Sequence, residues 1–189
     1  MNLQTIPYNS YEERLPQEGT IILGQPKADN IIVYQAFNDS IANYAVANQK
    51  FGGANYSFSR MTWIKPNFLW MMYRSGWATK EGQNRILAIE ITKSGFEELL
   101  TEGVLTTYKP IYGTAEEWKQ ALSQSNVRIQ WDPDHDYKGQ KLKRRAVQIG
   151  IKGKALEKFN TEFIKSIEDI TPFVTEQKNL IDQGEKTFL

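Results

Sequence analysis

The stretch RILAIEIT, residues 85–92, decides the fold because its hydrophobic residues alternate with a period of two. Leu87, Ile89 and Ile91 fall on one face of an extended chain, and Glu90 falls on the other. A strand with one face in the core and one face toward solvent shows this period. We therefore expect a half-buried strand over residues 85–92, around which the other elements are arranged.

Four more stretches, outward from this strand, have the character of β-strands. Residues 31–37, IIVYQAF, form a β-branched and aromatic run that is typical of a buried strand. Residues 127–131 alternate like the first stretch, and residues 146–151 form a further strand after a polar, charged connection. Residues 20–24 form a short candidate strand. The sequence thus predicts four or five strands.

Helix signals lie between these strands at irregular intervals. Pro66 stands where a first-turn proline fits, and Gly76 is the expected C-terminal stop of that helix. Ser94 and Thr114 each stand three residues before a glutamate, which is the spacing of a capping box. The predicted helices run over about residues 39–50, 66–75, 94–103, 114–123, 153–167 and 171–183.

The order of these elements favours the α+β class, because no regular strand–helix–strand alternation results. We expect a single domain over residues 1–189, with an irregular N-terminal segment at residues 1–19. Its core is predicted to be a mixed sheet of four to six strands packed with about six helices. The length of 189 residues suits one domain, and no repeat, low-complexity tract or linker divides the chain.

The composition excludes several kinds of site and partner. The chain has no cysteine, which excludes disulfides, thiolate catalysis, iron–sulfur clusters and cysteine-bound zinc. It begins MNLQTIPYNSYEERL, without the basic and apolar regions of a secretory signal, and has no run of about 18 apolar residues. We therefore expect a cytoplasmic protein with no membrane partner. Lys and Arg number 23 against 22 Asp and Glu, so polyanion binding must be local.

The segment RMTWIKPNFLWMMYRSGW, residues 60–77, combines indole rings with positive charges. Trp63, Trp70 and Trp77 are seven residues apart, and on a helix Arg74 is placed between the last two rings. A guanidinium held in this way is stiff and suits a phosphate or a carboxylate. The alternative is a core helix in which Arg74 packs its stem on the rings and pairs with a nearby carboxylate.

Two further cations, Arg60 and Lys65, stand just before this helix. The free amides and the dipole of a helix N-terminus attract anions, so these residues together predict an anion site. The glycine-rich phosphate motifs GxxxxGK[ST] and GxGxxG are absent. The alternative is that both cations are solvated residues flanking the start of a helix.

Three charged clusters offer other chemistry. The run WDPDHD, residues 131–136, contains the only histidine and suits acid–base catalysis, a hard cation or a polar turn. Residues 138–145 carry five cations, which suit a phosphate backbone or form a solvated loop. Glu168-Asp169 lies between two predicted helices, where it points into a cleft or pairs with a cap or a lysine. We assign no metal ligand.

Several strings of sequence together carry a family resemblance. They are VYQAF, the tryptophan-rich string of residues 60–77, LAIEIT, VRIQWDPD, VQIGI and SIEDITP, which span about residues 31–175. In these strings the chain closely resembles the family known as domain of unknown function 4291 (DUF4291). The resemblance covers most of the chain and implies no established activity, cofactor or catalytic residue.

A weaker resemblance links the chain to ADP-ribosyltransferase-like folds. These folds begin with a strand that bears a polar residue contacting NAD, and they supply a glutamate late in the chain. The resemblance implies that Gln35 and Glu168 take these two catalytic positions; it leaves the cofactor open, with NAD as the candidate. Gln35 departs from the usual Arg or His, and neither a Ser-Thr-Ser motif nor a paired-acid signature is present.

Three functions follow as hypotheses. The first is a nucleotide- or nucleic-acid-directed enzyme, including an NAD-using ADP-ribosyltransferase-like transferase, with Gln35 and Glu168 flanking the reacting group. The second is a non-catalytic module that binds RNA or a phosphorylated partner. The third is a structural role in which residues 60–77 belong to the core. The residues that we expect to bind the substrate are Tyr34, Arg60, Trp63, Lys65, Trp70, Tyr73, Arg74 and Trp77.

Overall fold

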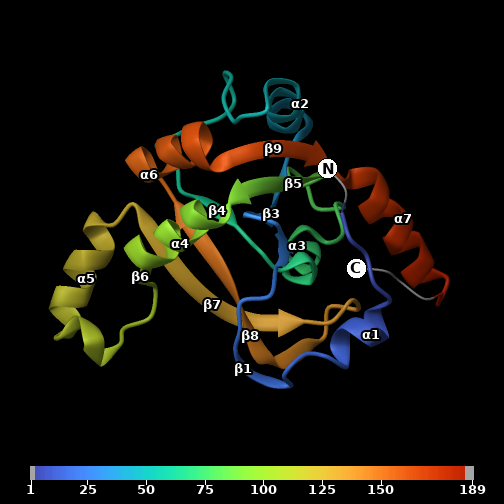
Figure 1. Ribbon diagram of the computed structural model, residues 1–189, viewed down its shortest axis with the longest axis horizontal. Helices are drawn as coiled ribbons and strands as arrows, with labels where there is room; N and C mark the ends of the chain where they lie inside the picture. Colours follow the sequence, from blue (N-terminus) through green and yellow to red (C-terminus); the bar gives the residue numbers. More distant parts are fainter. Residues whose placement is uncertain (1–2, 186–189) are drawn as a thin grey trace.

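The computed structural model describes residues 3–185 and shows an α+β fold with two β-sheets (Figure 1). The first sheet is mixed: β7 lies between β8 and β6, while β1 and β4 pair with different parts of β8. Strands β1 and β6 run parallel to their neighbours, and the other pairs are antiparallel. Its strands are β1 (Glu18–Thr20), β4 (Thr62–Ile64), β6 (Val104–Leu105), β7 (Val127–His135) and β8 (Lys141–Ile151).

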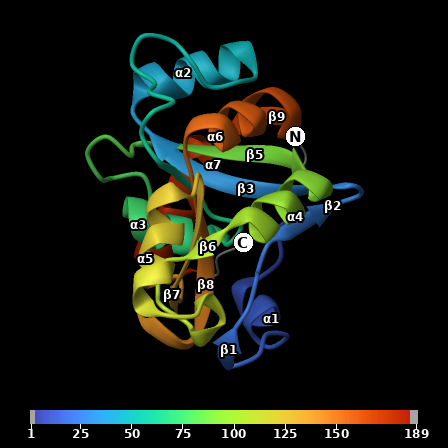
Figure 2. The same cartoon turned by 90° about the vertical axis from the view of Figure 1, so that its left-hand side faces the viewer.

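The second sheet is antiparallel throughout and has the strand order β2-β3-β5-β9. Its centre is the long pairing between β3 and β5, in which Asn30 faces Thr92 and Phe37 faces Arg85. Figure 2 shows β3 and β5 crossing the view while β7 and β8 of the first sheet run downward. The strands are β2 (Gln25–Lys27), β3 (Asn30–Phe37), β5 (Arg85–Thr92) and β9 (Ile164–Asp169).

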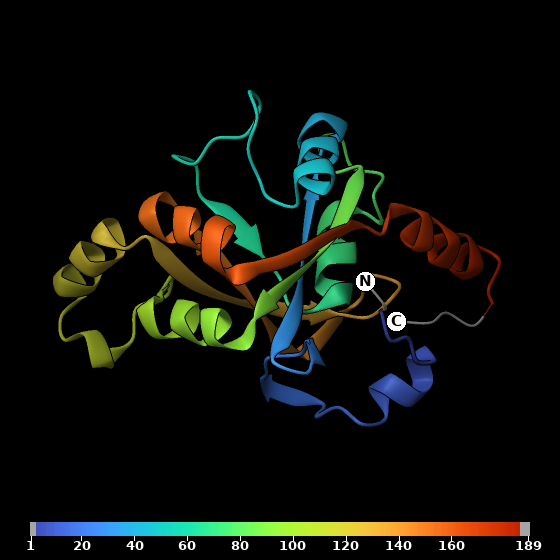
Figure 3. The ribbon, with the colours of Figure 1, turned by 45° about the horizontal axis from the view of Figure 1, so that its top comes forward.

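The helices lie around the two sheets rather than alternating with their strands. In Figures 1 and 3, α5 and α7 lie at opposite ends of the molecule, and α2 lies on the outer side of the second sheet. No helix within residues 3–185 combines the length and the apolar character needed to cross a membrane. The α-helices are α1 (Tyr8–Glu12), α2 (Asp39–Asn48), α3 (Phe68–Ser75), α4 (Lys93–Glu102), α5 (Ala115–Gln124), α6 (Gly153–Lys158) and α7 (Thr171–Asp182); a 3-10 turn covers Pro110–Tyr112 and a π-helical turn covers Phe159–Phe163.

Two hydrophobic clusters cover the two faces of the second sheet. The larger cluster joins Val33 and Leu87 of the second sheet to Ile129 and Ile149 of the first. The smaller cluster takes the opposite face of β3 and β5 and packs it against α3, α7 and residues of the N-terminal segment. Strand β5 is therefore buried on both faces, and the prediction of a half-buried strand at residues 85–92 is wrong. A central strand covered on both sides has this burial.

The two sheets are also joined through their backbones. Tyr34 of β3 and Lys65, the residue after β4, exchange both amide hydrogen bonds, with N–O distances of 2.7 and 3.1 Å. Lys65 is followed by Pro66 and then by Asn67, whose side chain accepts a hydrogen bond from the Trp70 amide and caps α3. This junction fixes where the side chain of Lys65 begins.

Most elements agree with the patterns in the sequence. The strand at residues 31–37, the α+β class and the end of α3 at Gly76 are confirmed. Thr114 forms the predicted capping box with Glu117, because the side chain of each residue accepts a hydrogen bond from the backbone amide of the other. A mixed sheet of four to six strands is present as the five-stranded first sheet, but the nine strands of residues 3–185 include a second sheet of four strands that we did not expect.

Three local predictions are wrong. The strand expected at residues 20–24 is replaced by β1 and β2 on either side of it. The segment at residues 1–19, expected to be irregular, contains α1, which an ion pair from Glu12 to Arg144 attaches to the first sheet. The helix expected over residues 153–167 ends in a π-helical turn, and the chain continues as β9 because it pairs with β5.

Candidate functional site

The side chain of Lys65 is a buried cation with few partners. Only 5% of the residue is exposed. Its Nζ donates one hydrogen bond, to the backbone oxygen of Trp63 at 3.3 Å, although an ammonium carries three donors. Among residues 3–185, no carboxylate lies within ion-pair distance of this nitrogen. A buried charge normally has a counter-ion, so the environment of Lys65 is incomplete.

Burial and a second cation lower the pKa of Lys65 to about 8. Burial is the larger cause because it disfavours the charged form, and the positive charge of Arg74 acts in the same direction. Asp132 opposes both effects. Arg74 lies in the last turn of α3, is exposed, and makes no ion pair within the described part of the chain. The site therefore holds two positive charges near one carboxylate.

That carboxylate is already bound by neutral groups. Asp132 accepts hydrogen bonds from Gln130 at 3.0 and 3.2 Å and from Gln148 at 2.7 Å. The two glutamines face each other across β7 and β8, on the sheet face opposite the larger hydrophobic cluster. Asp132 stabilises the charged form of Lys65 electrostatically, but it accepts no hydrogen bond from the ammonium.

Gln35 approaches the same backbone oxygen from the second sheet. Its Nε2 donates to Thr62 Oγ1 at 2.6 Å and to the Trp63 oxygen at 3.3 Å. Its Oε1 is buried and accepts no hydrogen bond within residues 3–185. An unsatisfied buried acceptor beside an under-bonded ammonium is a polar environment that a ligand would complete. We call Gln35, Trp63, Lys65, Arg74 and Asp132 the Lys65 site.

The structure brings together part of the predicted substrate-binding set. Lys65 and Arg74 act on each other electrostatically, and Trp63 is partly exposed beside them. The Trp63 ring lies over Gly150 of β8, where an added Cβ would come within 2.9 Å of it, so the glycine makes room for the indole. Arg60 is exposed ahead of β4, and no hydrogen bond or ion pair joins it to another described residue.

The other predicted aromatic residues belong to packing contacts. Trp70 stacks on His135 and Tyr73, with ring centroids 5.3 and 5.4 Å apart. Trp77 meets Phe68 edge to face at 6.1 Å. The cation–π contacts within residues 3–185 involve Lys138 and Lys158. None of these contacts is the predicted stacking of Arg74 between two indoles. Trp70 and Trp77 pack instead against different aromatic residues.

Tyr34 lies on the far side of the second sheet from Gln35. It is 4% exposed, belongs to the smaller hydrophobic cluster and meets Phe68 edge to face at 5.4 Å. Burial raises the pKa of its hydroxyl. It also lines a largely apolar cavity of about 310 Å³ between the N-terminal segment and the start of α3. Its predicted role in substrate binding stays a prediction.

Gln35 and Glu168 do not face one another. In the second sheet Glu168 stands in register with Ala88 and Tyr34, whereas Gln35 stands in register with Leu87 and the residue after Glu168. Residues in register point to one face, and the next row points to the other. The two side chains therefore leave the sheet on opposite faces, and the structure does not gather them around one reacting group.

The charged residues of β7 and β8 contribute to a buried ion-pair network. Arg144, 1% exposed, donates through Nε to Asp134 at 2.7 Å and through both terminal nitrogens to Glu12 at 2.6 and 2.7 Å. These bonds outweigh burial and raise the pKa of Arg144. Within the described residues, no group of three or more His, Cys, Asp or Glu side chains is placed to hold a metal ion.

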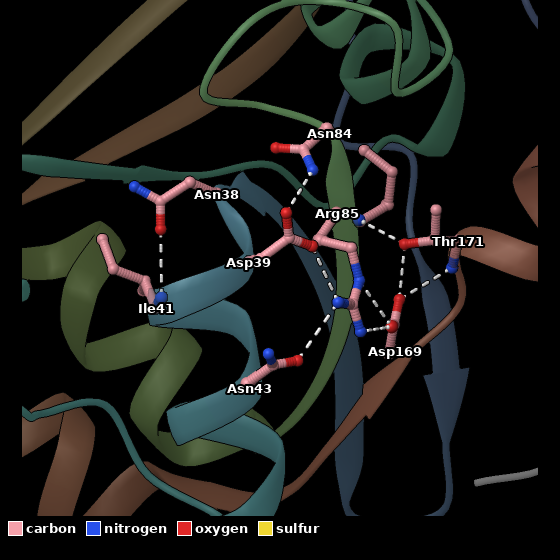
Figure 4. Close-up of polar contacts among 9 residues, drawn as sticks. Asn38, Asp39, Ile41, Asn43, Asn84, Arg85, Asp169 and Thr171 are labelled. Atoms are coloured by element: carbon pink, nitrogen blue, oxygen red, sulfur yellow. Dashed lines mark hydrogen bonds and ion pairs between the residues drawn. The ribbon is translucent and has the colours of Figure 1, made fainter.

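Figure 4 shows a second polar network, around Arg85 at the start of β5. The guanidinium donates to Asp39 and Asn43 of α2 and to Asp169 at the end of β9. Burial alone would raise the pKa of Asp169, but hydrogen bonds from Arg85 and Thr171 lower it. This network connects three elements, and its charges are paired, so it is an architectural feature.

Comparison with known protein families identifies a match over most of the chain. The model of the family described as "Domain of unknown function (DUF4291)" matches residues 21–189, which is nearly the whole chain. A search of curated proteins finds no match.

Proposed function

We propose that this chain, which belongs to the DUF4291 family, is a nucleotide- or nucleic-acid-directed enzyme that holds a phosphate of its substrate at the Lys65 site. One observation carries the proposal: Lys65 is a buried ammonium with a single 3.3 Å hydrogen bond and no ion pair within residues 3–185. Burying a charge without a partner is costly. A phosphate oxygen would supply both the missing acceptors and the missing negative charge.

The neighbours of Lys65 suit the rest of a nucleotide. Arg74 adds a second, exposed cation that can bind two phosphate oxygens at once. Trp63 offers a partly exposed ring on which a base can stack. Gln35 offers a free acceptor, Oε1, to a hydroxyl or amino group of the ligand. Phosphate, ring and polar group would thus each find a matching side chain.

An enzymatic role is supported by the lowered pKa of Lys65. With a pKa of about 8, roughly a tenth of the amine is neutral at pH 7, whereas an ordinary lysine is almost entirely protonated. The neutral form of a lysine acts as a general base or as a nucleophile, whereas the protonated form is the one that would bind a phosphate. The proposal includes NAD among the substrates, since an ADP-ribosyltransferase-like transferase would use Gln35 at this site.

A non-catalytic module that binds RNA or a phosphorylated partner is the second candidate. The observation that favours it is the arrangement of Gln35 and Glu168 on opposite faces of the second sheet. Such a module would bind with an affinity that falls steeply with salt, because phosphate contacts release counterions. It would convert no substrate.

The test combines binding and turnover. Titration calorimetry with ATP, NAD and a short single-stranded RNA is carried out on the wild type, Lys65→Met, Arg74→Gln and the control Lys80→Gln, an exposed lysine beyond α3. We expect each of the first two changes to weaken binding about tenfold or more and the control to leave it unchanged. Circular dichroism of each variant verifies the fold. Unchanged binding in folded Lys65→Met and Arg74→Gln would overturn the proposal.

Turnover separates the two candidates. Consumption of NAD or ATP, or modification of the RNA, at catalytic protein concentrations would reject the binding module. Binding that weakens with salt, depends on Lys65 and Arg74, and is accompanied by no conversion of any of the three ligands would reject the enzyme.

A further inference from the structure

A cavity of about 360 Å³ lies at the first sheet, away from the Lys65 site. Its polar and aromatic wall comes from four separate segments: β1, the loop after β6, β7 and β8. This volume falls within the range of small-ligand sites. The residues that matter for its chemistry are Thr20, Thr106, Thr107, Lys109, Trp131 and Arg145.

The cavity has an excess of positive charge. Lys109 and Arg145 line it, and none of its lining side chains is acidic. Neither cation forms an ion pair with another residue of the described chain. Arg145 donates from Nη2 to the Trp131 backbone oxygen at 3.0 Å, which orients the guanidinium and leaves its other donors free. Two unpaired cations on one concave wall favour an anion.

The same wall offers a flat ring and hydroxyl groups. The Trp131 indole, partly buried against the larger hydrophobic cluster, has no aromatic ring contact within residues 3–185, whereas Trp70 and Trp77 each contact another ring. The hydroxyls of Thr20, Thr106 and Thr107 make no hydrogen bond to the described protein. A phosphate between the cations and an aromatic ring on the indole would use all of these groups.

We propose that this cavity is a second ligand site, which binds a nucleoside monophosphate with its phosphate at Lys109 and Arg145 and its base on Trp131. It is separate from the Lys65 site, because Trp131 and Asp132 are consecutive in β7 and point to opposite faces of the first sheet. In β8, Arg145 points to the same sheet face as Trp131, because the residues before and after it point to the opposite face. The proposal therefore stands whether or not the Lys65 site binds a nucleotide.

The test follows the Trp131 indole N–H by two-dimensional NMR of the full chain. Trp131→Phe removes one of the five indole signals and so identifies it. AMP, adenosine and inorganic phosphate are then titrated into the wild type, Arg145→Gln, Lys109→Gln and the control Lys119→Gln, an exposed lysine of α5. Lys109 and Arg145 are exposed, so their exchange for glutamine preserves the fold.

We expect AMP to shift the Trp131 signal in a saturable way and to bind at least tenfold more tightly than adenosine or phosphate alone. Arg145→Gln and Lys109→Gln are expected to weaken AMP binding roughly tenfold each, and Lys119→Gln to leave it unchanged. Adenosine binding as tightly as AMP would overturn the phosphate assignment, and phosphate binding as tightly as AMP would overturn the stacking. AMP that shifts only indoles other than Trp131 would overturn the site.

Discussion

Replacing Lys65 by methionine should stabilise the protein while removing its anion binding. The pKa of Lys65 falls from its ordinary value of 10.5 to about 8 in the folded chain, first because of burial and then because of Arg74. At 1.36 kcal/mol for each pH unit, the charged side chain costs the folded state about 3 kcal/mol at neutral pH. Methionine fills a similar volume without charge but loses the hydrogen bond to Trp63. The expected net gain is about 2 kcal/mol.

The sign of the pH dependence follows from the same pair of values. Below pH 8 the lysine is protonated in both the folded and unfolded chains, so the full cost is present. As the pH rises above 8 the folded chain releases its proton first, and the cost declines to about 2 kcal/mol at pH 9 and vanishes above about pH 11. The advantage of Lys65→Met over the wild type must therefore shrink between pH 8 and pH 11.

Urea unfolding of both proteins at pH 7, 8, 9 and 10 measures this difference. The comparison at each pH cancels the titration of all other groups, provided that the slopes of the two unfolding curves agree. A variant that is less stable than the wild type at pH 7 would refute the reasoning, because Lys65 would then contribute a favourable contact. An advantage that stays constant from pH 7 to 10 would refute the lowered pKa.

Three further predictions concern Arg74, Asp134 and His135. Arg74→Gln removes a positive charge near Lys65 and so raises the pKa of Lys65. The pH above which stability begins to rise should therefore be higher in this variant than in the wild type; an unchanged pH profile would contradict this. Asp134→Ala leaves the buried Arg144 without one of its two carboxylate partners and should cost about 3–5 kcal/mol in urea unfolding; a loss under about 1 kcal/mol would show that the pair is dispensable. Burial lowers the pKa of His135 below its ordinary 6.5; Lys141 acts in the same direction and Asp134 opposes it. The unfolded chain therefore takes up this proton first, and stability should decline as the pH falls from about 6.5 to the lowered pKa of the folded chain. His135→Gln should lack that decline.

The sequence predicted the elements whose signals are local. Residues 31–37 are β-branched and aromatic over their whole length, and Thr114 carries its own partner three residues later. Residues 153–167 failed for a non-local reason. Leu156, Phe159 and Phe163 are buried as the helical spacing requires, but Ile167 reaches the same cluster from a strand. Pairing with β5, more than 70 residues earlier, outweighed the helical pattern.

The candidate site was predictable in part. The sequence selected Arg60, Lys65 and Arg74 as the cations of one anion site, and the structure places Lys65 and Arg74 near each other. It did not select Asp132 as their neighbour, because that neighbour is fixed by the register of β4, β8 and β7. The alternation of Gln130 and Asp132 with hydrophobic residues was a usable signal, since it marks the polar face of a strand. No local sequence pattern identified Glu12 as an ion-pair partner, because Arg144 lies 132 residues away in the chain.

The density of unusual residues in the segment of residues 60–77 is mainly a consequence of its position in the fold. It supplies β4 to the first sheet, exchanges hydrogen bonds with β3 of the second, and ends in α3, which fills the smaller hydrophobic cluster. Trp70 and Trp77 are accounted for by that packing. Lys65 and Arg74 are not, because neither has an ion-pair partner in the described chain and their mutual repulsion is unfavourable to folding. A feature that costs stability and serves no architectural contact is expected at a functional site. Lys65 and Arg74, the cations that this packing does not explain, are therefore the residues that point to a functional site.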